Sequence, residues 1–95
     1  MSIMQSWLEC NISEGLLPDE YAVKCNSADG HIFSFFAPSD FIDVNNNLVK
    51  VHVMECQNDY CLIYVPFEPL EGLGRTVKVS TVDLKNNGKQ VKINT

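Results

Sequence analysis

Alternation of apolar and polar residues, the pattern of β-strands, dominates the chain from residue 21 onward. Five stretches show it or are rich in β-branched and aromatic residues: 21–25, 31–37, 48–57, 60–67 and 75–80. Between them lie short segments of Gly, Asn, Asp, Ser and Pro, residues that favour turns. The pattern therefore predicts five short strands joined mostly by tight turns, with 38–47 and 68–74 as the longer loops.

The turn in the first hairpin, Ser27 to Gly30, sets which side chains share a face. A loop of two or four residues gives a common face made of Tyr21, Val23, Cys25, Ile32, Ser34 and Phe36. The opposite face of the second strand would then carry His31, Phe33 and Phe35. A strand that is apolar on both faces is typical of a barrel or a subunit contact.

The first ten residues show a different period. Ser2 and Gln5 have the spacing of a capping box, and the apolar residues Ile3, Met4, Trp7 and Leu8 fall on a single helical face. The pattern predicts a short helix at about 2–10. A strand over Trp7–Ile12 is the competing interpretation.

The C-terminal segment contains Asn87-Gly88, a hairpin signal. If the segment folds back, Leu84 faces Val91, Val82 faces Ile93, and Asp83 faces Lys92 as a cross-strand ion pair. The alternative is a loose basic tail. We therefore expect one domain over 1–83 and a basic tail or hairpin over 84–95. The fold class is all-β: a short N-terminal helix, then a five-stranded, strongly bent antiparallel small barrel.

The bulk composition agrees with one small folded domain. The chain has 95 residues, 45% of them hydrophobic, and a formal net charge of −5. A negative net charge disfavours sequence-independent binding to nucleic acid. Residues 1–74 carry two basic against eleven acidic side chains, a net of −9, whereas residues 75–95 carry five against one, a net of +4. The basic end is either solvated or contacts a polyanion or another part of the protein.

The N-terminal sequence has no basic segment followed by a signal-like apolar run, and no stretch approaches the length that spans a bilayer. The expectation is a cytoplasmic protein with no membrane partner. A reducing compartment disfavours disulfides.

Four cysteines, at positions 10, 25, 56 and 61, lack the C-x-x-C spacing of zinc sites. With a two-residue Asn58-Asp59 loop, Cys56 and Cys61 fall opposite each other in a non-hydrogen-bonded pair. In a reducing compartment two free thiols are favoured over a disulfide. A thiol or metal site that also uses His52, on the same face, is the alternative.

No arrangement typical of an enzyme is evident. His31 and His52 have no neighbouring nucleophile or acidic dyad in the sequence, and Gly72 and Gly74 precede a strand rather than a helix, unlike a phosphate-binding loop. The sequence predicts a non-enzymatic protein with no cofactor and no metal.

Two features suggest contacts with other molecules. Seven aromatic residues either form the core or offer stacking surfaces for bases: Phe33, Phe35, Phe36, Phe41, Tyr60, Tyr64 and Phe67. The strand Leu48–Met54 is apolar on both faces, which favours pairing with a neighbouring copy. We therefore expect a homo-oligomer.

The segment Ile42–Val49 carries Asp43 followed by three asparagines and then aliphatic residues. This spacing, together with the helix, the bent strands and the Asp-Gly turn, resembles the Sm-like family over about residues 2–83. The resemblance implies that Asn47 hydrogen-bonds a base and that Asp43 orients it. The sequence departs from the family where Phe35 replaces a glycine, in a longer spacing before Asp43, and where Val79-Ser80-Thr81 replaces an apolar-Arg-Gly motif. Src-homology-3-type barrels have a similar strand count.

Two functions follow from this pattern. The first is a homo-oligomeric Sm-like ring that binds single-stranded RNA through Asp43, Asn45, Asn46 and Asn47. The alternative is a protein-interaction or structural module with no nucleic-acid binding, which uses strand edges or the basic tail. In the second case the asparagines form a turn and cap their own amides.

Overall fold

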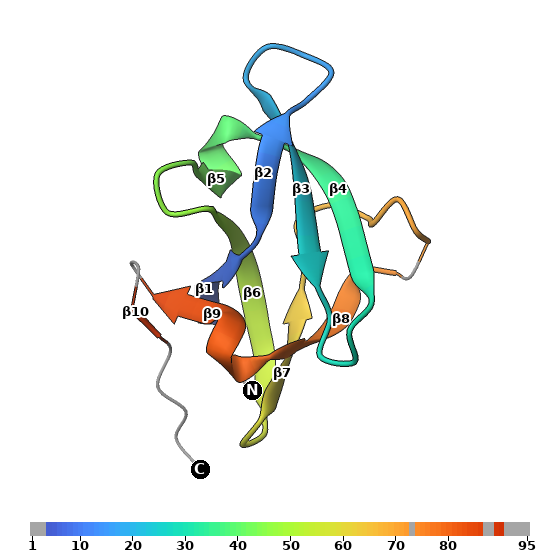
Figure 1. The fold of residues 1–95 in the computed structure, drawn as a ribbon. Helices are drawn as coiled ribbons and strands as arrows, with labels where there is room; N and C mark the ends of the chain where they lie inside the picture. Colours follow the sequence, from blue (N-terminus) through green and yellow to red (C-terminus); the bar gives the residue numbers. More distant parts are fainter. Residues whose placement is uncertain (1–3, 73, 87–88, 91–95) are drawn as a thin grey trace.

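The chain folds into two antiparallel β-sheets, with no helix of more than one turn among the residues described (Figure 1). The computed structural model describes residues 4–72, 74–86 and 89–90. The elements in chain order are β1 (Met4–Glu9), β2 (Asn11–Glu14), β3 (Glu20–Asn26), β4 (Ile32–Pro38), the 3-10 turn η1 (Ser39–Phe41), β5 (Ile42–Asp43), β6 (Leu48–Cys56), β7 (Tyr60–Tyr64), β8 (Thr76–Ser80), the 3-10 turn η2 (Thr81–Asp83), β9 (Leu84–Asn86) and β10 (Lys89–Gln90).

The larger sheet has the order β10-β9-β1-β6-β7-β8, and β5 pairs with β6 on the same side as β7. The smaller sheet is β2-β3-β4. The chain passes from one sheet to the other at Cys10, between β1 and β2 (Figure 1). Cys10 still donates its backbone N–H to the carbonyl of Asn47 (3.0 Å), so the β1–β6 ladder reaches the bend.

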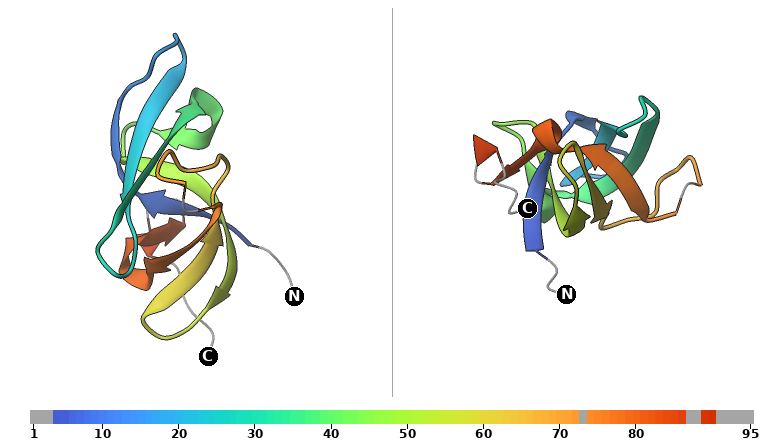
Figure 2. Two further views of the ribbon diagram at one scale, coloured as in Figure 1. Left: turned by 90° about the vertical axis from the view of Figure 1, so that its right-hand side faces the viewer. Right: turned by 90° about the horizontal axis from the view of Figure 1, so that it is seen from below.

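The core takes residues from both sheets. Figure 2 shows how the two sheets are arranged. Phe33, Phe35 and Val23 come from the smaller sheet, and Ile63 and Leu84 come from the larger one; each is at most 1% exposed. Burial of these side chains is the main favourable term in folding, at roughly 25 cal/mol per Å² of apolar surface removed from water.

The expected N-terminal helix is wrong: Met4–Glu9 is a β-strand. Ser6 and Leu8 point into the core, and Ser6 satisfies its hydroxyl by donating to the carbonyl of Lys85 (2.9 Å). Trp7 is half-buried, with Lys50 over its ring at 5.6 Å. The strand pattern was therefore hidden, because its inward row contains a serine and its outward row contains a tryptophan. The competing interpretation of a strand over Trp7–Ile12 is correct in kind, but the strand bends at Cys10.

The expected closed barrel is not found: the described strands form two separate sheets. Where a barrel would have a continuous ladder between β4 and β8, local hydrogen bonds connect the two sheets. Ala28, in the β3–β4 turn, donates its N–H to the carbonyl of Lys78 on β8 (2.8 Å). Leu70, in the β7–β8 loop, donates to the carbonyl of Ser34 on β4 (2.8 Å), and Ser34 donates from its N–H and hydroxyl to the carboxylate of Glu71 (2.7 and 2.6 Å). These contacts cover parts of two strand edges that would otherwise be open to pairing.

The first hairpin has the predicted strands but the wrong register. Asn26 pairs with Ile32, so the loop has five residues, an odd number, and the faces are exchanged. Val23 and Cys25 share the core face with Phe33, Phe35 and Ala37. Ile32 is 57% exposed on the other face, so β4 is not buried on both sides.

The remaining strands confirm the sequence pattern. The β6–β7 hairpin turns at Asn58-Asp59, with Cys56 opposite Cys61, and β8 follows the long loop. A β-bulge at Met54, between Val53 and Glu55, shifts the register.

The C-terminal hairpin is found in the predicted register, with Lys89 opposite Asn86 and Gln90 opposite Lys85. Its turn residues, Asn87-Gly88, and the expected partners Val91, Lys92 and Ile93 lie outside the described residues. β9 pairs with β1, and Leu84 is fully buried, so the sheet continues past residue 83. In the described parts of the chain, no helix is long and apolar enough to cross a membrane.

Candidate functional site

The three asparagines, together with Val44, form the four-residue turn between β5 and β6. Asp43 accepts hydrogen bonds from the backbone N–H (3.2 Å) and from the side-chain amide (2.8 Å) of Asn46. Asn47 has a left-handed backbone (φ 56°), a conformation that asparagine tolerates better than most residues. Its carbonyl accepts from Cys10. Asp43 thus orients Asn46, whereas the resemblance implied that it orients Asn47. These are the contacts of a self-capped turn.

The side chains of Asn45, Asn46 and Asn47 are exposed, and Asp43 is half-buried. The structure thus brings the four predicted site residues together on one exposed turn. One of the three amides, that of Asn46, is already bound to Asp43. This leaves Asn45 and Asn47 as the amides through which the turn would contact a base.

Cations cover several of the aromatic rings that the sequence offered as stacking surfaces. The Nζ of Lys78 lies 4.3 Å from the ring centre of Tyr60, and the guanidinium of Arg75 lies 4.2 Å from that of Tyr64. Arg75 also donates to the carbonyls of Val65 (3.0 Å) and Pro66 (2.8 Å). Both cations thus make intramolecular cation–π contacts, and Arg75 also makes intramolecular hydrogen bonds.

Four of the remaining aromatic candidates lie in or against the core, and the fifth, Phe36, is on the other face of β4. Phe33 and Phe35 are fully buried. Phe41 and Phe67 pack edge to face at 5.4 Å, and Phe36 is half-buried. Most of the seven aromatic residues therefore lie in or against the core, which was the alternative to a base-stacking surface.

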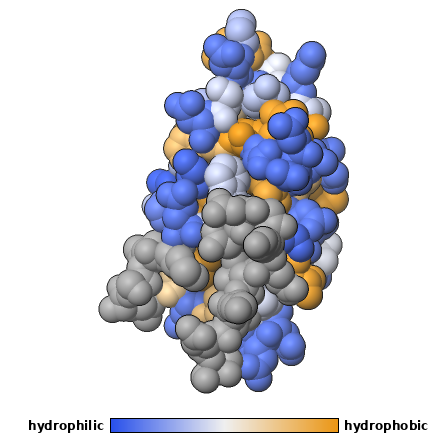
Figure 3. Space-filling view, turned by 90° about the vertical axis from the view of Figure 1, so that its left-hand side faces the viewer, coloured by the Kyte–Doolittle hydropathy of each residue, from blue (hydrophilic) through white to orange (hydrophobic). Residues whose placement is uncertain are grey.

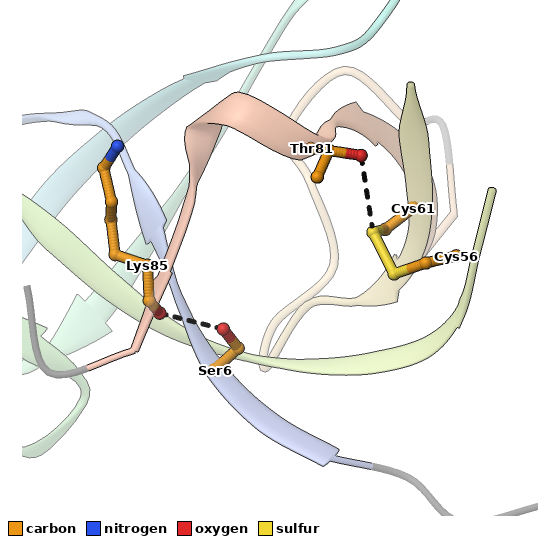
Figure 4. Close-up of a disulfide and its surroundings, with 5 residues drawn as sticks. All are labelled: Ser6, Cys56, Cys61, Thr81 and Lys85. Carbon is orange, nitrogen blue, oxygen red and sulfur yellow. Dashed lines mark hydrogen bonds between the residues drawn. A yellow bond between two sulfur atoms is a disulfide. The ribbon is translucent and has the colours of Figure 1, made fainter. Parts of the chain in front are cut away.

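The cysteines of the β6–β7 hairpin are joined by a disulfide bond, Cys56–Cys61, so the expectation of two free thiols is wrong (Figure 4). The predicted geometry is confirmed. Gln57 donates its N–H to the carbonyl of Tyr60 (2.8 Å), which makes the next pair, Cys56 and Cys61, the non-hydrogen-bonded one. Thr81 of η2 lies 3.9 Å from the Cys61 sulfur.

His52 does not lie with this pair. The bulge at Met54 reverses the alternation of β6, so His52 pairs with the exposed Tyr64, while Cys61 and Ile63 face the core. In the described residues, no group of three or more His, Cys, Asp and Glu side chains could hold a metal ion. His31 is near Asp29 (3.5 Å) in an exposed turn.

An open pocket of about 360 Å³ lies where the β3–β4 turn meets the β6–β7 turn and β8. Asp29 and Asp59 line it, together with Lys78 and Tyr60. A hydrogen bond from the Ser27 hydroxyl lowers the pKa of Asp29 below its ordinary value. The pocket therefore presents the negative charges of Asp29 and Asp59. The cation that lines it, Lys78, already lies over the ring of Tyr60.

The loop between β2 and β3, Gly15–Asp19, carries a feature that the sequence interpretation missed. Leu16 and Leu17 are adjacent, 81% and 65% exposed, at the projecting end of the β2–β3 hairpin (Figure 1). Apolar surface lies beside hydrophilic surface at this upper end of the molecule (Figure 3). The signal in the sequence was an apolar pair directly before Pro18, between two elements.

Hydrogen bonds hold this loop in one shape. Gly15 donates its N–H to the Glu20 carbonyl (3.0 Å), Leu16 donates to the Glu20 carboxylate (3.2 Å), and Glu20 donates to the Leu17 carbonyl (3.2 Å). Asp19 has a left-handed backbone (φ 64°). A Cβ on Gly15 would lie 2.7 Å from the Glu20 carbonyl oxygen, so only glycine fits there.

Comparison with protein-family models, with curated proteins and with solved structures found no match to this chain. The geometry of its own residues is therefore the basis for any functional conclusion.

Proposed function

We propose that the chain is a non-enzymatic protein-interaction module that contacts its partner through Leu16 and Leu17. The observation that carries this proposal is the exposure of both side chains, 81% and 65%, on a loop whose backbone is held by Glu20. Burying a leucine against a partner is favourable by roughly 1.5–3 kcal/mol. A loop that is already ordered loses little conformational freedom on binding.

The charge around the loop indicates the chemistry of the partner. Glu14, Asp19 and Glu20 flank the leucines, and no Lys or Arg lies between residues 1 and 23. The surface that fits this end of the molecule is an apolar pocket rimmed by basic side chains. Such an arrangement speeds association through long-range attraction and excludes acidic competitors.

The alternative, a homo-oligomeric Sm-like ring that binds single-stranded RNA at Asp43 and Asn45–Asn47, has less support from the contacts. Asn46 is bound to Asp43, and Arg75, Lys78 and Lys50 lie over aromatic rings of the same chain. Binding of RNA requires cations that neutralise phosphates and rings that stack with bases.

Photo-crosslinking tests the proposal because it captures any protein that contacts the loop. A photoreactive amino acid is placed at position 17 or, as a matched control, at position 70, because Leu17 and Leu70 have the same 65% exposure. The full chain is expressed in its native cells and irradiated. We expect a discrete protein adduct from position 17 that position 70 does not give.

The crosslinked protein is then purified, and its affinity for the chain is measured by calorimetry. Leu16→Ser together with Leu17→Ser should weaken binding about 100-fold or more, whereas Leu70→Ser should leave it unchanged. Equal affinity of the double variant would overturn the proposal. An adduct between two copies of the chain, with a matching multimer in native mass spectrometry, would favour the homo-oligomer instead.

A further inference from the structure

The two remaining cysteines are Cys25, in β3, and Cys10, at the bend just before β2, the strand that pairs with β3. The last pair of the β2–β3 ladder is Asn11 with Lys24, and continuing its register by one residue places Cys10 opposite Cys25. Both are buried, Cys10 to 8% and Cys25 to 2% exposure, and both are free thiols. The sequence interpretation did not bring them together, because it placed residues 2–10 in a helix.

Cys10 and Cys25 occupy the same kind of ladder position as the disulfide-bonded Cys56 and Cys61. Gly15 donates its N–H to the Glu20 carbonyl, which makes Gly15 and Glu20 a hydrogen-bonded pair. Alternation along an antiparallel ladder then makes Cys10 and Cys25 a non-hydrogen-bonded pair, as Cys56 and Cys61 are. Such pairs have Cα atoms about 4.5 Å apart, within the range that disulfides bridge.

The surroundings of Cys25 disfavour its thiolate. The neighbouring Cys10 side chain and burial together raise the pKa of Cys25 well above its ordinary value. The Cys10 thiol in turn donates to the carbonyl of Asn47 (3.5 Å). Cys10 also lines an open pocket of about 230 Å³ next to Lys24 and Asp83, which gives a small reagent a way to this residue from the surface.

We propose that Cys10 and Cys25 are an oxidation site that forms a second cross-strand disulfide, linking the β1–β2 bend to β3. The oxidant is a small-molecule disulfide such as oxidised glutathione. The Cys10 thiolate attacks one sulfur of the reagent and releases the first glutathione thiolate, giving a mixed disulfide. The Cys25 thiolate then attacks the Cys10 sulfur and releases the second glutathione thiolate.

The atoms and electrons of this exchange balance. Two protein thiols become one disulfide and lose two electrons, and the reagent disulfide gains them and becomes two thiols, which take up the two protons. Cys10 reacts first because it lines the pocket, and Cys25 resolves the mixed disulfide because it is buried next to Cys10.

The test uses the full chain and a Cys56→Ala/Cys61→Ala variant, which leaves only Cys10 and Cys25. Both proteins are incubated with oxidised glutathione under native conditions, and intact mass and non-reducing peptide maps are recorded. We expect the variant to lose the mass of two hydrogen atoms and to give one linked peptide pair, Cys10–Cys25. The full chain should give two linked pairs.

The new link closes a segment of about 15 residues and should raise the folding equilibrium constant about 100-fold, measured by urea unfolding of oxidised and reduced variant. A variant with Cys25→Ala in addition should stop at a glutathione adduct on Cys10 and show no such gain. Two free thiols after full oxidation, a stable adduct with Cys25 free, or a link from Cys10 to Cys56 or Cys61 in the full chain would overturn the proposal. If the Cys56→Ala/Cys61→Ala variant does not fold, the peptide map of the full chain decides alone.

Discussion

The β2–β3 loop and the β5–β6 turn share two backbone features, but the first exposes apolar side chains and the second exposes polar ones. In the β2–β3 loop, Glu20 accepts a hydrogen bond from the N–H of Leu16, and Asp19 is left-handed. In the β5–β6 turn, Asp43 accepts from the N–H of Asn46, and Asn47 is left-handed. Each loop thus has a carboxylate that accepts a hydrogen bond from a backbone amide of the same loop. Each also has one residue with a positive φ.

The loops differ in what is left for other molecules. Asp43 also binds the side-chain amide of Asn46, so the polar turn satisfies part of its own hydrogen-bonding capacity. Leu16 and Leu17 both remain more than half exposed, so most of their apolar surface is open to other molecules. Polar side chains at a turn are explained by the turn itself, whereas exposed leucines on an ordered loop are not. The leucine loop is therefore the better functional candidate.

The largest expected effect comes from Gly15→Ala. The new Cβ would lie 2.7 Å from the Glu20 carbonyl oxygen, a backbone atom, so the loop must open. We expect a loss of about 1–3 kcal/mol in the free energy of unfolding, measured with urea, and a loss of partner binding. Gly30→Ala is the control, because its site has open space and a positive φ of 85°, and it should lose stability but keep binding. Unchanged binding by Gly15→Ala would show that the loop shape does not matter.

A variant with a smaller expected effect tests which of two proposed roles Asn47 has, forming the turn or contacting RNA. Alanine is disfavoured at its φ of 56°, so Asn47→Ala should cost about 1 kcal/mol in urea unfolding, while Asn47→Gly should cost little. Because the glycine variant lacks the amide but suits the turn, it tests RNA binding without loss of fold. Fluorescence anisotropy with a labelled single-stranded RNA should show no difference between wild type and Asn47→Gly. A clear loss with Asn47→Gly would make the polar turn the functional one.

The smallest effect concerns a third loop held by a carboxylate, the one that precedes β8. The Ser34 hydroxyl and N–H donate to Glu71 and lower its pKa below the ordinary 4.5. Because the folded-state pKa is lowered, the stabilisation is complete above about pH 4.5 and is lost as the pH falls through the folded value. Urea unfolding between pH 6 and 3 should show a shallower acid loss for Glu71→Gln than for wild type. Glu68→Gln, an exposed carboxylate on the same loop, is the control and should follow wild type.

Local patterns in the sequence determined most of the strands and turns. The alternation in 21–25, 31–37, 48–57, 60–67 and 75–80 corresponds to β3, β4, β6, β7 and β8. The register of the β9–β10 hairpin, and that of the β6–β7 hairpin next to its turn, also followed from neighbouring residues. These features are decided by backbone preferences over a few residues, so they depend little on the rest of the chain.

The candidate site was predicted in part. Asp43 and Asn45–Asn47 were identified as a group and do lie together, and the same residues were also expected to be a turn, which their contacts explain. Leu16 and Leu17 were not identified, because exposure is a property of the packed molecule. A pair of leucines in a sequence is usually core, and only the surrounding elements show whether it is covered.

Other features depended on partners far away in the chain or on a one-residue difference. Met4–Glu9 is a strand because it fills the place between β6 and β9, and its buried Ser6 finds a partner 79 residues away in Lys85. One extra residue in the β3–β4 loop exchanged the faces of that hairpin, and the bulge at Met54 moved His52 away from Cys61. The facing of Cys10 and Cys25 exists only once the chain bends between the sheets. Side-chain period carries no information about which distant segments meet, so the tertiary structure decided these points.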